Sequence, residues 1–247
     1  MNITEMHLAV QQGVDKINSF QADTLLSEEI DLELNKAINK FVNLKYGKNN
    51  LYGKGFEESQ KRVDDLRVLI KDIELSPIDY QDTTVNNIFV YRTPRLPKDY
   101  RFLLKGLAVV NHKSTCKPLN NKQQTIAGHL VKTDKDVIQK KASVKFVQQD
   151  DILSILSDPF NTTTKEKPLI TIEDESIVIH TNDIFIIDSV KLTYIKNPTE
   201  VSLSLGDDCE LAEQTHQEII DMAINSILEG ISDPRYKTQQ IELGKNE

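Results

Sequence analysis

The sequence predicts an α+β protein: a small helical bundle, made of three N-terminal helices and a long C-terminal helix, with an inserted and mainly antiparallel β region. Apolar residues recur every three or four positions at both ends of the chain, which is the period of an α-helix. Between the ends they alternate or form short runs, as in β-strands. The 247 residues are 38% hydrophobic and 28% charged, and no apolar run approaches the ~20 residues that cross a bilayer. We therefore expect a folded, soluble protein without a membrane segment.

The first third of the chain predicts three amphipathic helices. The second begins near Ser27, which we expect to cap it, and ends before Gly47. The third extends toward Pro77, because the residue before a proline disfavours helical backbone. The inward-facing residues of the three helices are Met6, Val10, Val14 and Ile17; Ile30, Leu34, Ile38, Phe41 and Leu44 or Lys45; and Phe56, Val63, Leu66, Ile70 and Ile73.

The middle of the chain predicts mainly strands. Turn residues such as Asn182 and Asp183 separate the later apolar runs at the spacing of an antiparallel meander. Residues 98–105 and 150–156 are expected to form short helices, and residues 126–131 and 137–147 a hairpin or its two arms. The expected strands are residues 88–91, 107–110, 126–131, 137–147, 169–172, 177–180, 184–187, 190–195 and 201–205.

The chain then returns to helix. Thr215 and Glu218 match a capping box, in which the hydroxyl bonds a backbone amide and the glutamate reaches back. The apolar stripe that follows is broad, so we expect burial on more than one side, against the N-terminal helices. The residues of this stripe are Ile219, Ile220, Met222, Ala223, Ile224, Ile227, Leu228 and Ile231. The predicted division is a helical bundle of residues 1–84 and 206–231, an inserted β region of residues 85–205, and an extended tail of residues 232–247.

Motifs that carry chemistry are scarce. None of the five histidines has a second His or Cys at a zinc-ligand spacing, and Cys116 and Cys209 stand alone. The Asp150–Asp151 and Asp207–Asp208 pairs could hold a cation, but acidic residues beside a helix start are usually caps. His216 has no oriented partner that would make it a general base. We therefore expect no enzymatic activity, no cofactor and no metal, although an unrecognised active site stays open on the sequence alone.

The formal net charge of −8 is unevenly distributed along the chain. Residues 1–84 hold 10 basic and 15 acidic side chains, residues 85–150 hold 13 and 4, and residues 151–247 hold 7 and 19. The basic segment, residues 92–145, is the strongest anomaly in the sequence. The candidate contact residues, in this segment and in the tail, are Arg92, Arg95, Lys98, Arg101, Lys140, Lys141, Arg235 and Tyr236.

Three interpretations of the basic segment remain open. Its lysines could protect a solvated sheet edge from pairing with other strands. It could contact phosphates, which would make the protein a nucleic-acid-binding module, although few aromatic residues accompany the basic ones. It could also contact an acidic protein surface, and the acidic last third of the same chain provides one. Two complementary faces on one subunit suit a head-to-tail ring.

A family resemblance rests on three stretches of the sequence: MHLAVQQGVDKINSF with residues 28–42; residues 149–160 with 169–174 and 192–198; and LAEQTHQEIID up to residue 236. These stretches resemble the tail-ring and head–tail connector (adaptor) proteins of crAss-like short-tailed bacteriophages. The last helix is similar to the C-terminal helix of adaptors in other short-tailed phages, with Ala212 where a proline is common. Residues 48–147, which include the whole basic segment, match poorly.

The resemblance implies a non-enzymatic structural protein of the virion. Identical copies would form a ring, dodecameric by analogy with portal-matched rings, around the channel through which DNA leaves the capsid. The β region would reach neighbouring subunits or the next ring, and the tail after Ser232 would dock on a partner. The implied partners are copies of the chain itself, the portal protein or adjacent tail-ring proteins, and passing DNA. The implied location is the tail or connector of the virion, after assembly in the host cytoplasm.

Overall fold

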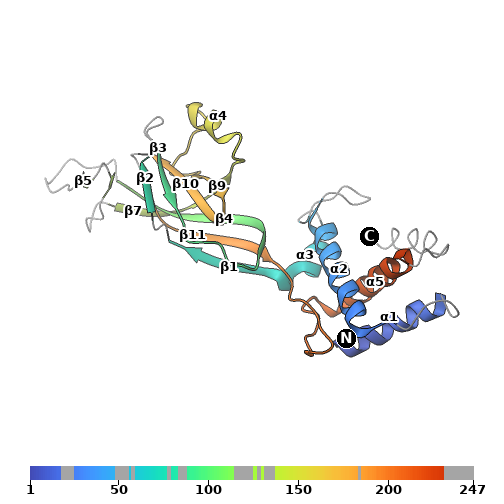
Figure 1. Ribbon diagram of the computed structural model, residues 1–247. Coiled ribbons are helices and arrows are strands. Elements are labelled where there is room, and N and C mark those ends of the chain that lie inside the picture. The colour runs from blue at the N-terminus through green and yellow to red at the C-terminus, as the bar shows by residue number, and fades with distance from the viewer. Residues whose placement is uncertain are drawn as a thin grey trace. The chain divides into compact units, whose positions relative to one another are not determined.

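The chain forms an α+β structure, seen in a computed structural model (Figure 1). The structure describes residues 1–17, 25–47, 56, 59–76, 79–82, 88–113, 125–126, 129–130, 137–182 and 185–230. Contacts divide the chain into two compact units, Met1–Ile70 with Asn197–Glu247 and Lys71–Lys196. The first is built from helices and the second mainly from strands, so the strand unit is an insertion in the sequence of the helical unit. No helix in these described ranges is long and apolar enough to cross a membrane.

The described part of the helical unit contains four α-helices: α1 (Ile3–Ile17), α2 (Ser27–Tyr46), α3 (Gln60–Leu66) and α5 (His216–Gly230). Helix α5 packs against both α1 and α2, as its broad apolar stripe predicts. A methyl group added at Gly13 of α1 would collide with the Ile224 side chain, so α1 and α5 meet closely. The buried apolar residues of α5 are Ile219, Ile220, Ala223, Ile224, Ile227 and Leu228.

The first two predicted helices are confirmed, with one correction at the start of α2. At its last turn Lys45, one of the two predicted alternatives, takes the buried position. The prediction that Ser27 caps this helix is wrong, because Leu26 occupies the N-cap position. Glu29 at the N3 position makes the glutamate half of a capping box: its Oε2 accepts a hydrogen bond from the Leu26 N–H at 3.0 Å. The predicted inward residues that are buried in α1 and α2 are Met6, Val10, Val14, Ile30, Leu34, Ile38 and Phe41.

The third predicted helix is too long. Helix α3 ends at Leu66, a 3₁₀ turn follows at Arg67–Leu69, and strand β1 spans Ile70–Leu75. The predicted helical range 1–84 therefore includes β1 and strand β2 (Asp79–Asp82), although nearly all of β1 and the whole of β2 fall within the second unit.

Strand β1 shows why helical spacing misled the prediction. Ile73 and Leu75 face the apolar core of the second unit, whereas Asp72 and Glu74 accept hydrogen bonds from Thr193 and Ser189 of strand β11. Apolar residues at every second position indicate a strand, and apolar residues at every third or fourth position indicate a helix. A short segment can satisfy both patterns. Pairing with β11 selects the strand.

Two sheets pack face to face in the second unit, with strand orders β1-β11-β4-β7 and β2-β3-β10-β9-β8. In the second sheet β8 and β9 run parallel, whereas β10 with β3 and β9, and β2 with β3, run antiparallel. In the first sheet β4 runs antiparallel to both β11 and β7. The further strands are β3 (Ile88–Arg92), β4 (Tyr100–Lys113), β5 (Thr125–Ile126), β6 (His129–Leu130), β7 (Val137–Ser143), β8 (Lys145–Phe146), β9 (Leu169–Glu173), β10 (Ser176–Asn182) and β11 (Phe185–Lys196). The sandwich core between the two sheets includes Ala108, Val110, Ile170, Ile177, Ile179, Val190 and Leu192.

Three predictions in this region are wrong. Residues 98–105 form no helix, because β4 pairs with β11 from Tyr100 onward. Residues 185–187 and 190–195 belong to the single strand β11, in which a register shift between Ile187 and Ser189 absorbs the irregular pattern; residue 184 lies outside the described residues. Residues 201–205 form no strand; an isolated bridge joins Ser202 to Asp207 instead.

Helix α4 (Ile152–Ser157) covers the outer face of the second sheet, in agreement with the helix predicted at residues 150–156. In Figure 1 it lies over β9 and β10, on the opposite side of that sheet from β4 and β11. It contributes to a second apolar cluster, made of Ile88, Val147, Ile152, Leu156 and Leu169. The outer face of the first sheet carries no such helix among the described residues and is polar around Lys105.

The strands β1 and β11 lie at the two ends of the inserted unit and are neighbours in one sheet. Asp72 contacts Thr193, and Glu74 contacts Ser189. Glu74 lies two residues after Asp72 in β1, whereas Ser189 lies four residues before Thr193 in β11. The contacts step backwards along β11, so the two strands run antiparallel. The first residue of β1 and the last of β11 therefore lie at the same end of the sheet.

We expect Ile227→Asp to unfold the helical unit. Ile227 is 7% exposed on a helix packed against α1 and α2, and an unpaired carboxylate there has no hydrogen-bonding partner. The expected loss is at least about 4 kcal/mol of unfolding free energy, measured by urea denaturation. Leu8→Asp is the matched control, because Leu8 of α1 is 55% exposed and should lose less than about 1 kcal/mol. Equal stabilities would show that the buried face of α5 has been misassigned.

Candidate functional site

Two of the predicted contact residues are already paired within the second unit. Arg92 Nη2 lies 3.0 Å from Glu173 Oε2, and Arg95 Nε lies 3.4 Å from Glu175 Oε2. Arg92 ends β3, while Glu173 ends β9, two strands away in the same sheet. The two glutamates therefore offset much of the positive charge that the sequence places at this end of the basic segment.

The other predicted residues do not form one cluster with these arginines. Lys98 is exposed in the turn before β4. Arg101 is half-buried, and burial lowers the pKa of its guanidinium. The central carbon of this guanidinium lies 5.4 Å from the centre of the Phe102 ring. Lys140 and Lys141 are exposed on β7, which ends its sheet, and point to opposite faces as adjacent strand residues. The remaining predicted residues, Arg235 and Tyr236, and the predicted tail lie outside the described residues, as does Cys116.

The basic segment belongs to a structural unit whose net charge is much smaller than that of the segment itself. The second unit, Lys71–Lys196, holds 18 basic and 16 acidic side chains, and the rest of the chain holds 12 and 22. The segment that is strongly basic in the sequence thus belongs to a nearly balanced unit. The helical unit carries the excess of negative charge.

The outer face of the first sheet keeps a local group of lysines. Leu107 of β4 is 37% exposed there, opposite Lys191 of β11. Lys105 lies two residues before Leu107 on the same face. Lys141 of β7 pairs with Val109, which lies two residues after Leu107. Asp72 is the acidic neighbour: it accepts a hydrogen bond from Thr193 and lies 2.9 Å from Lys191, contacts that lower its pKa. We call Leu107 with Lys105, Lys141 and Lys191 the lysine face.

Sequence reasoning missed the lysine face because it placed a helix at residues 98–105. The alternation of Lys105, Leu107 and Val109 with buried Gly106 and Ala108 is a strand pattern that could have revealed it.

A buried ion network joins three helices of the first unit. Lys45 of α2 is 4% exposed. Its ammonium lies 3.0 Å from Glu218 Oε2 of α5 and 3.8 Å from Asp65 Oδ2 of α3. Neither of these oxygens accepts a well-directed hydrogen bond from a described residue, so the attraction is chiefly between charges. Lys61 reaches Glu218 Oε1 at 3.3 Å, and Gln214 donates to Asp65 Oδ1 at 3.0 Å.

This network also corrects the predicted capping box of the last helix. A 3₁₀ turn at Glu213–Thr215 precedes α5, and the Thr215 hydroxyl donates to the Ala212 carbonyl at 2.7 Å. Glu218 faces Lys45 and Lys61 rather than the start of its own helix.

The segment between the strand unit and α5 is fastened to the helices by side chains that bond its backbone. Asn35 donates to the Val201 carbonyl at 3.0 Å and accepts from the Val201 N–H at 2.9 Å. Both carboxylate oxygens of Asp31 accept from the Leu203 N–H, at 3.2 and 3.1 Å. Asp208 accepts from the Ile3 N–H at 2.7 Å, so this carboxylate bonds the first turn of α1, far away in the sequence, rather than the helix that follows it in the chain.

Three histidine rings, those of His7, His180 and His216, have partners inside the protein. His7 Nε2 lies 2.7 Å from Asp31 Oδ1, and His216 Nε2 donates to the Leu211 carbonyl at 3.0 Å. Burial in the strand unit lowers the pKa of His180 to about 4, against a smaller opposite effect of Glu173. His180 Nε2 lies 3.2 Å from the Thr171 hydroxyl. Each of these three rings is held by an internal partner.

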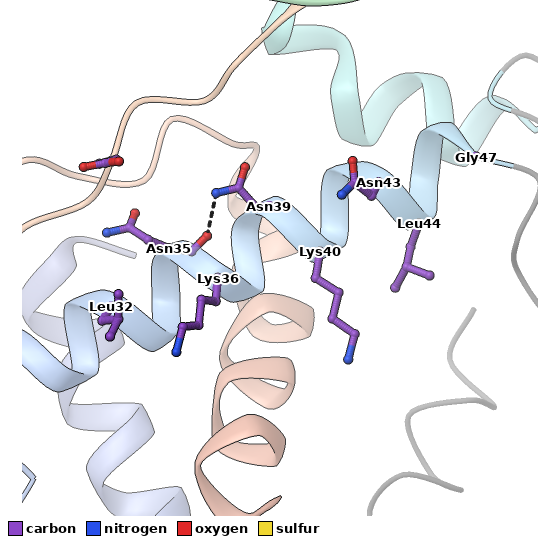
Figure 2. A pocket seen from close by; sticks show the side chains of 9 residues that line it. Leu32, Asn35, Lys36, Asn39, Lys40, Asn43, Leu44 and Gly47 are labelled. Atoms are coloured by element: carbon purple, nitrogen blue, oxygen red, sulfur yellow. Dashed lines mark hydrogen bonds between the residues drawn. The ribbon is translucent and has the colours of Figure 1, made fainter. Parts of the chain in front are cut away.

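An open groove of about 630 Å³ follows α2 (Figure 2). Asn35, Asn39 and Asn43 recur at one residue per turn along one side, and Asn39 donates to the Asn35 carbonyl at 3.0 Å. The full lining is Leu32, Asn35, Lys36, Asn39, Lys40, Asn43, Leu44, Gly47 and Glu200. Leu32, Leu44 and the aliphatic stems of the lysines make much of this lining apolar, and it holds no nucleophile next to a base.

Thiol and metal chemistry find little support in the structure. Burial raises the pKa of the Cys209 thiol, which disfavours the reactive thiolate. Among the described residues, no three His, Cys, Asp or Glu side chains gather in a group that could hold a metal ion.

Comparison with known proteins gives no assignment: no protein-family model and no curated protein matches the chain.

We expect Lys45→Ala to cost about 3–5 kcal/mol of unfolding free energy, because it leaves two carboxylates without their buried cation. Lys36→Ala is the matched control on the same helix. Lys36 pairs with Glu33 at 2.6 Å but its side chain is 57% exposed, so its loss should cost less than about 1 kcal/mol. Chemical denaturation of both variants measures the difference. A cost for Lys45→Ala as small as that for Lys36→Ala would remove the network as a determinant of stability.

We also expect His180 to make stability depend on pH. Its folded pKa of about 4 lies below the ordinary value of 6.5, so the neutral ring stabilises the fold fully above 6.5. This contribution is lost as the pH falls from 6.5 toward 4. Between pH 7 and pH 4.5 the wild type should lose about 2 kcal/mol more unfolding free energy than His180→Gln. Urea denaturation at both pH values measures this difference, and parallel losses would contradict the assignment.

Proposed function

We propose that this chain is a structural ring subunit of the connector or tail of a short-tailed bacteriophage. Copies of the chain, twelve by analogy with portal-matched rings, would join portal and tail around the DNA channel. The observation that carries the proposal is the division of the chain into an acidic helical unit and an inserted strand unit with exposed lysines. Two surfaces of opposite charge on one subunit allow the same contact to repeat from copy to copy.

The helical unit would act as the small bundle that stacks and orients each subunit. Its buried ion network and the close contact of α1 with α5 support a rigid role. The sandwich would reach neighbouring subunits or the adjacent ring, and the portal or adjacent tail-ring proteins would be the other partners. The proposal includes no catalytic step, and passing DNA would be a transient contact.

The nucleic-acid-binding alternative has less support. Arg92 and Arg95, which would contact phosphates, are held by Glu173 and Glu175. The unit that contains the basic segment holds 16 acidic side chains against 18 basic ones. Phosphate binding gains affinity from uncompensated positive charge, so this near balance weakens it.

Cryo-electron microscopy of virions of the phage that encodes the chain tests the proposal. We expect a symmetric ring at the connector or tail into which the two units can be fitted, and tailless capsids when the gene carries a nonsense mutation. The control is complementation with the wild-type chain, which should restore the tail. Tails that contain no copy of the chain would exclude the proposed function.

A further inference from the structure

A short hairpin in the helical unit displays an apolar side chain on an acidic surface. Leu205 is 78% exposed, although leucine normally stabilises a protein by leaving water. It lies between Ser202 and Asp207, whose backbones form an isolated bridge, and next to Gly206, whose positive φ of 73° permits the tight turn. The hairpin tip therefore holds Leu205 in one place and away from the core.

The hairpin is rigidly attached to the helices behind it. Asn35 bonds both backbone groups of Val201, and Asp31 bonds the amide of Leu203, so the residues before the tip are fixed. After the tip, Asp208 is fixed by the Ile3 N–H. A side chain held ready in its contact position loses little conformational freedom when a partner covers it.

The segment that carries the tip is acidic, and Lys36 and Lys40 of α2 line the same groove as its Glu200. Residues 197–211 contain four acidic side chains, Glu200, Asp207, Asp208 and Glu210, and no lysine or arginine. Asp208 caps α1, and Glu210 accepts hydrogen bonds from Thr199. Glu200 and Asp207 are exposed and lie close to Leu205 in the sequence. A partner for this surface needs an exposed apolar group bordered by cations.

The lysine face of the strand unit has this composition. Leu107 is exposed at its centre, Lys191 is its cross-strand neighbour, and Lys105 and Lys141 border it. Directly opposed residues on a sheet lie about 5 Å apart, so one leucine side chain could touch Leu107 while carboxylates reach the lysines. Asp72 offsets part of the charge of Lys191 and, to a smaller extent, that of Lys105, whereas Lys141 lies on the far strand β7.

We propose that the hairpin tip of one copy docks on the lysine face of a second copy, with Leu205 against Leu107 and Glu200 and Asp207 toward Lys105 and Lys141. The two surfaces are different, so the contact is head-to-tail and generates a ring where the rotation closes. This contact rests on the proposed function, because it names the surfaces through which the subunits of the ring would meet. A contact of one hairpin is small, so two copies should associate weakly and gain strength when several contacts close a ring.

The test is a charge reversal in the full-length chain. Variant one carries Glu200→Lys and Asp207→Lys, and variant two carries Lys105→Glu and Lys141→Glu. Sedimentation velocity at low ionic strength over a concentration series should show self-association of the wild type. Each variant alone should associate at least about tenfold more weakly, and a mixture of the two should recover association to within about threefold of the wild type. The association should weaken with added salt, as expected for exposed charges.

The matched control carries Lys167→Glu and Glu166→Lys, exposed charges of the same types outside both surfaces, and should associate like the wild type. All substituted residues are exposed, and circular dichroism checks that each variant remains folded. Leu205→Ser should weaken association without changing any charge.

Three results would overturn the proposed contact: no self-association of the wild type, association unchanged in both variants, or a mixture that associates no better than either variant. Unchanged association would leave the ring-subunit proposal intact, because the copies would then meet through another surface. The absence of the chain from virion tails would instead exclude the ring function, whatever the mixing experiment shows.

Discussion

The fold of the helical unit depends on one buried ammonium group. Lys45 lies near the end of α2, and its two carboxylate partners come from α3, before the inserted unit, and from α5, after it. Burying an ion pair costs solvation energy, so it stabilises a fold less than it restricts the arrangement of the partners. An apolar stripe tolerates small rotations of a helix, whereas a cation between two carboxylates does not. The network thus fixes how the last helix meets the first ones across an interruption of the chain.

Charge also organises the surfaces, in a way that net charge conceals. In the strand unit, Arg92 and Arg95 are offset by glutamates, and the lysines around Leu107 remain exposed. In the helical unit, acids gather on a hairpin that side-chain hydrogen bonds hold against α1 and α2. An attraction between such surfaces acts over about one Debye length and favours one orientation of approach. Both surfaces are small, so repetition of the contact, rather than its area, would provide the strength.

Helical periodicity in the sequence predicted α1, α2 and α5, because each buries a continuous stripe along its length. It failed at residues 70–75, where Ile73 and Leu75 fit two periods and the choice lies with the partner strand β11. The short helix expected at residues 98–105 is also wrong, because the chain pairs with β11 from Tyr100 onward. The sequence shows the excess of basic residues in the basic segment, but it does not show the acidic residues that pair with them. Glu173, for example, is 81 positions from Arg92. Interactions of this separation exist once the chain is folded, and no local pattern encodes them.

The antiparallel pairing of β1 with β11 has a consequence for how such a protein can change over time. It brings the beginning and the end of the strand unit to one end of one sheet, so the helical unit is interrupted at a single point. Loop closure costs little when the ends of the loop already lie together. A single recombination event could therefore add, remove or exchange the whole sandwich while every helix keeps its neighbours. The two units can diverge at different rates, the helices constrained by their common core and the sandwich by whatever surface it meets.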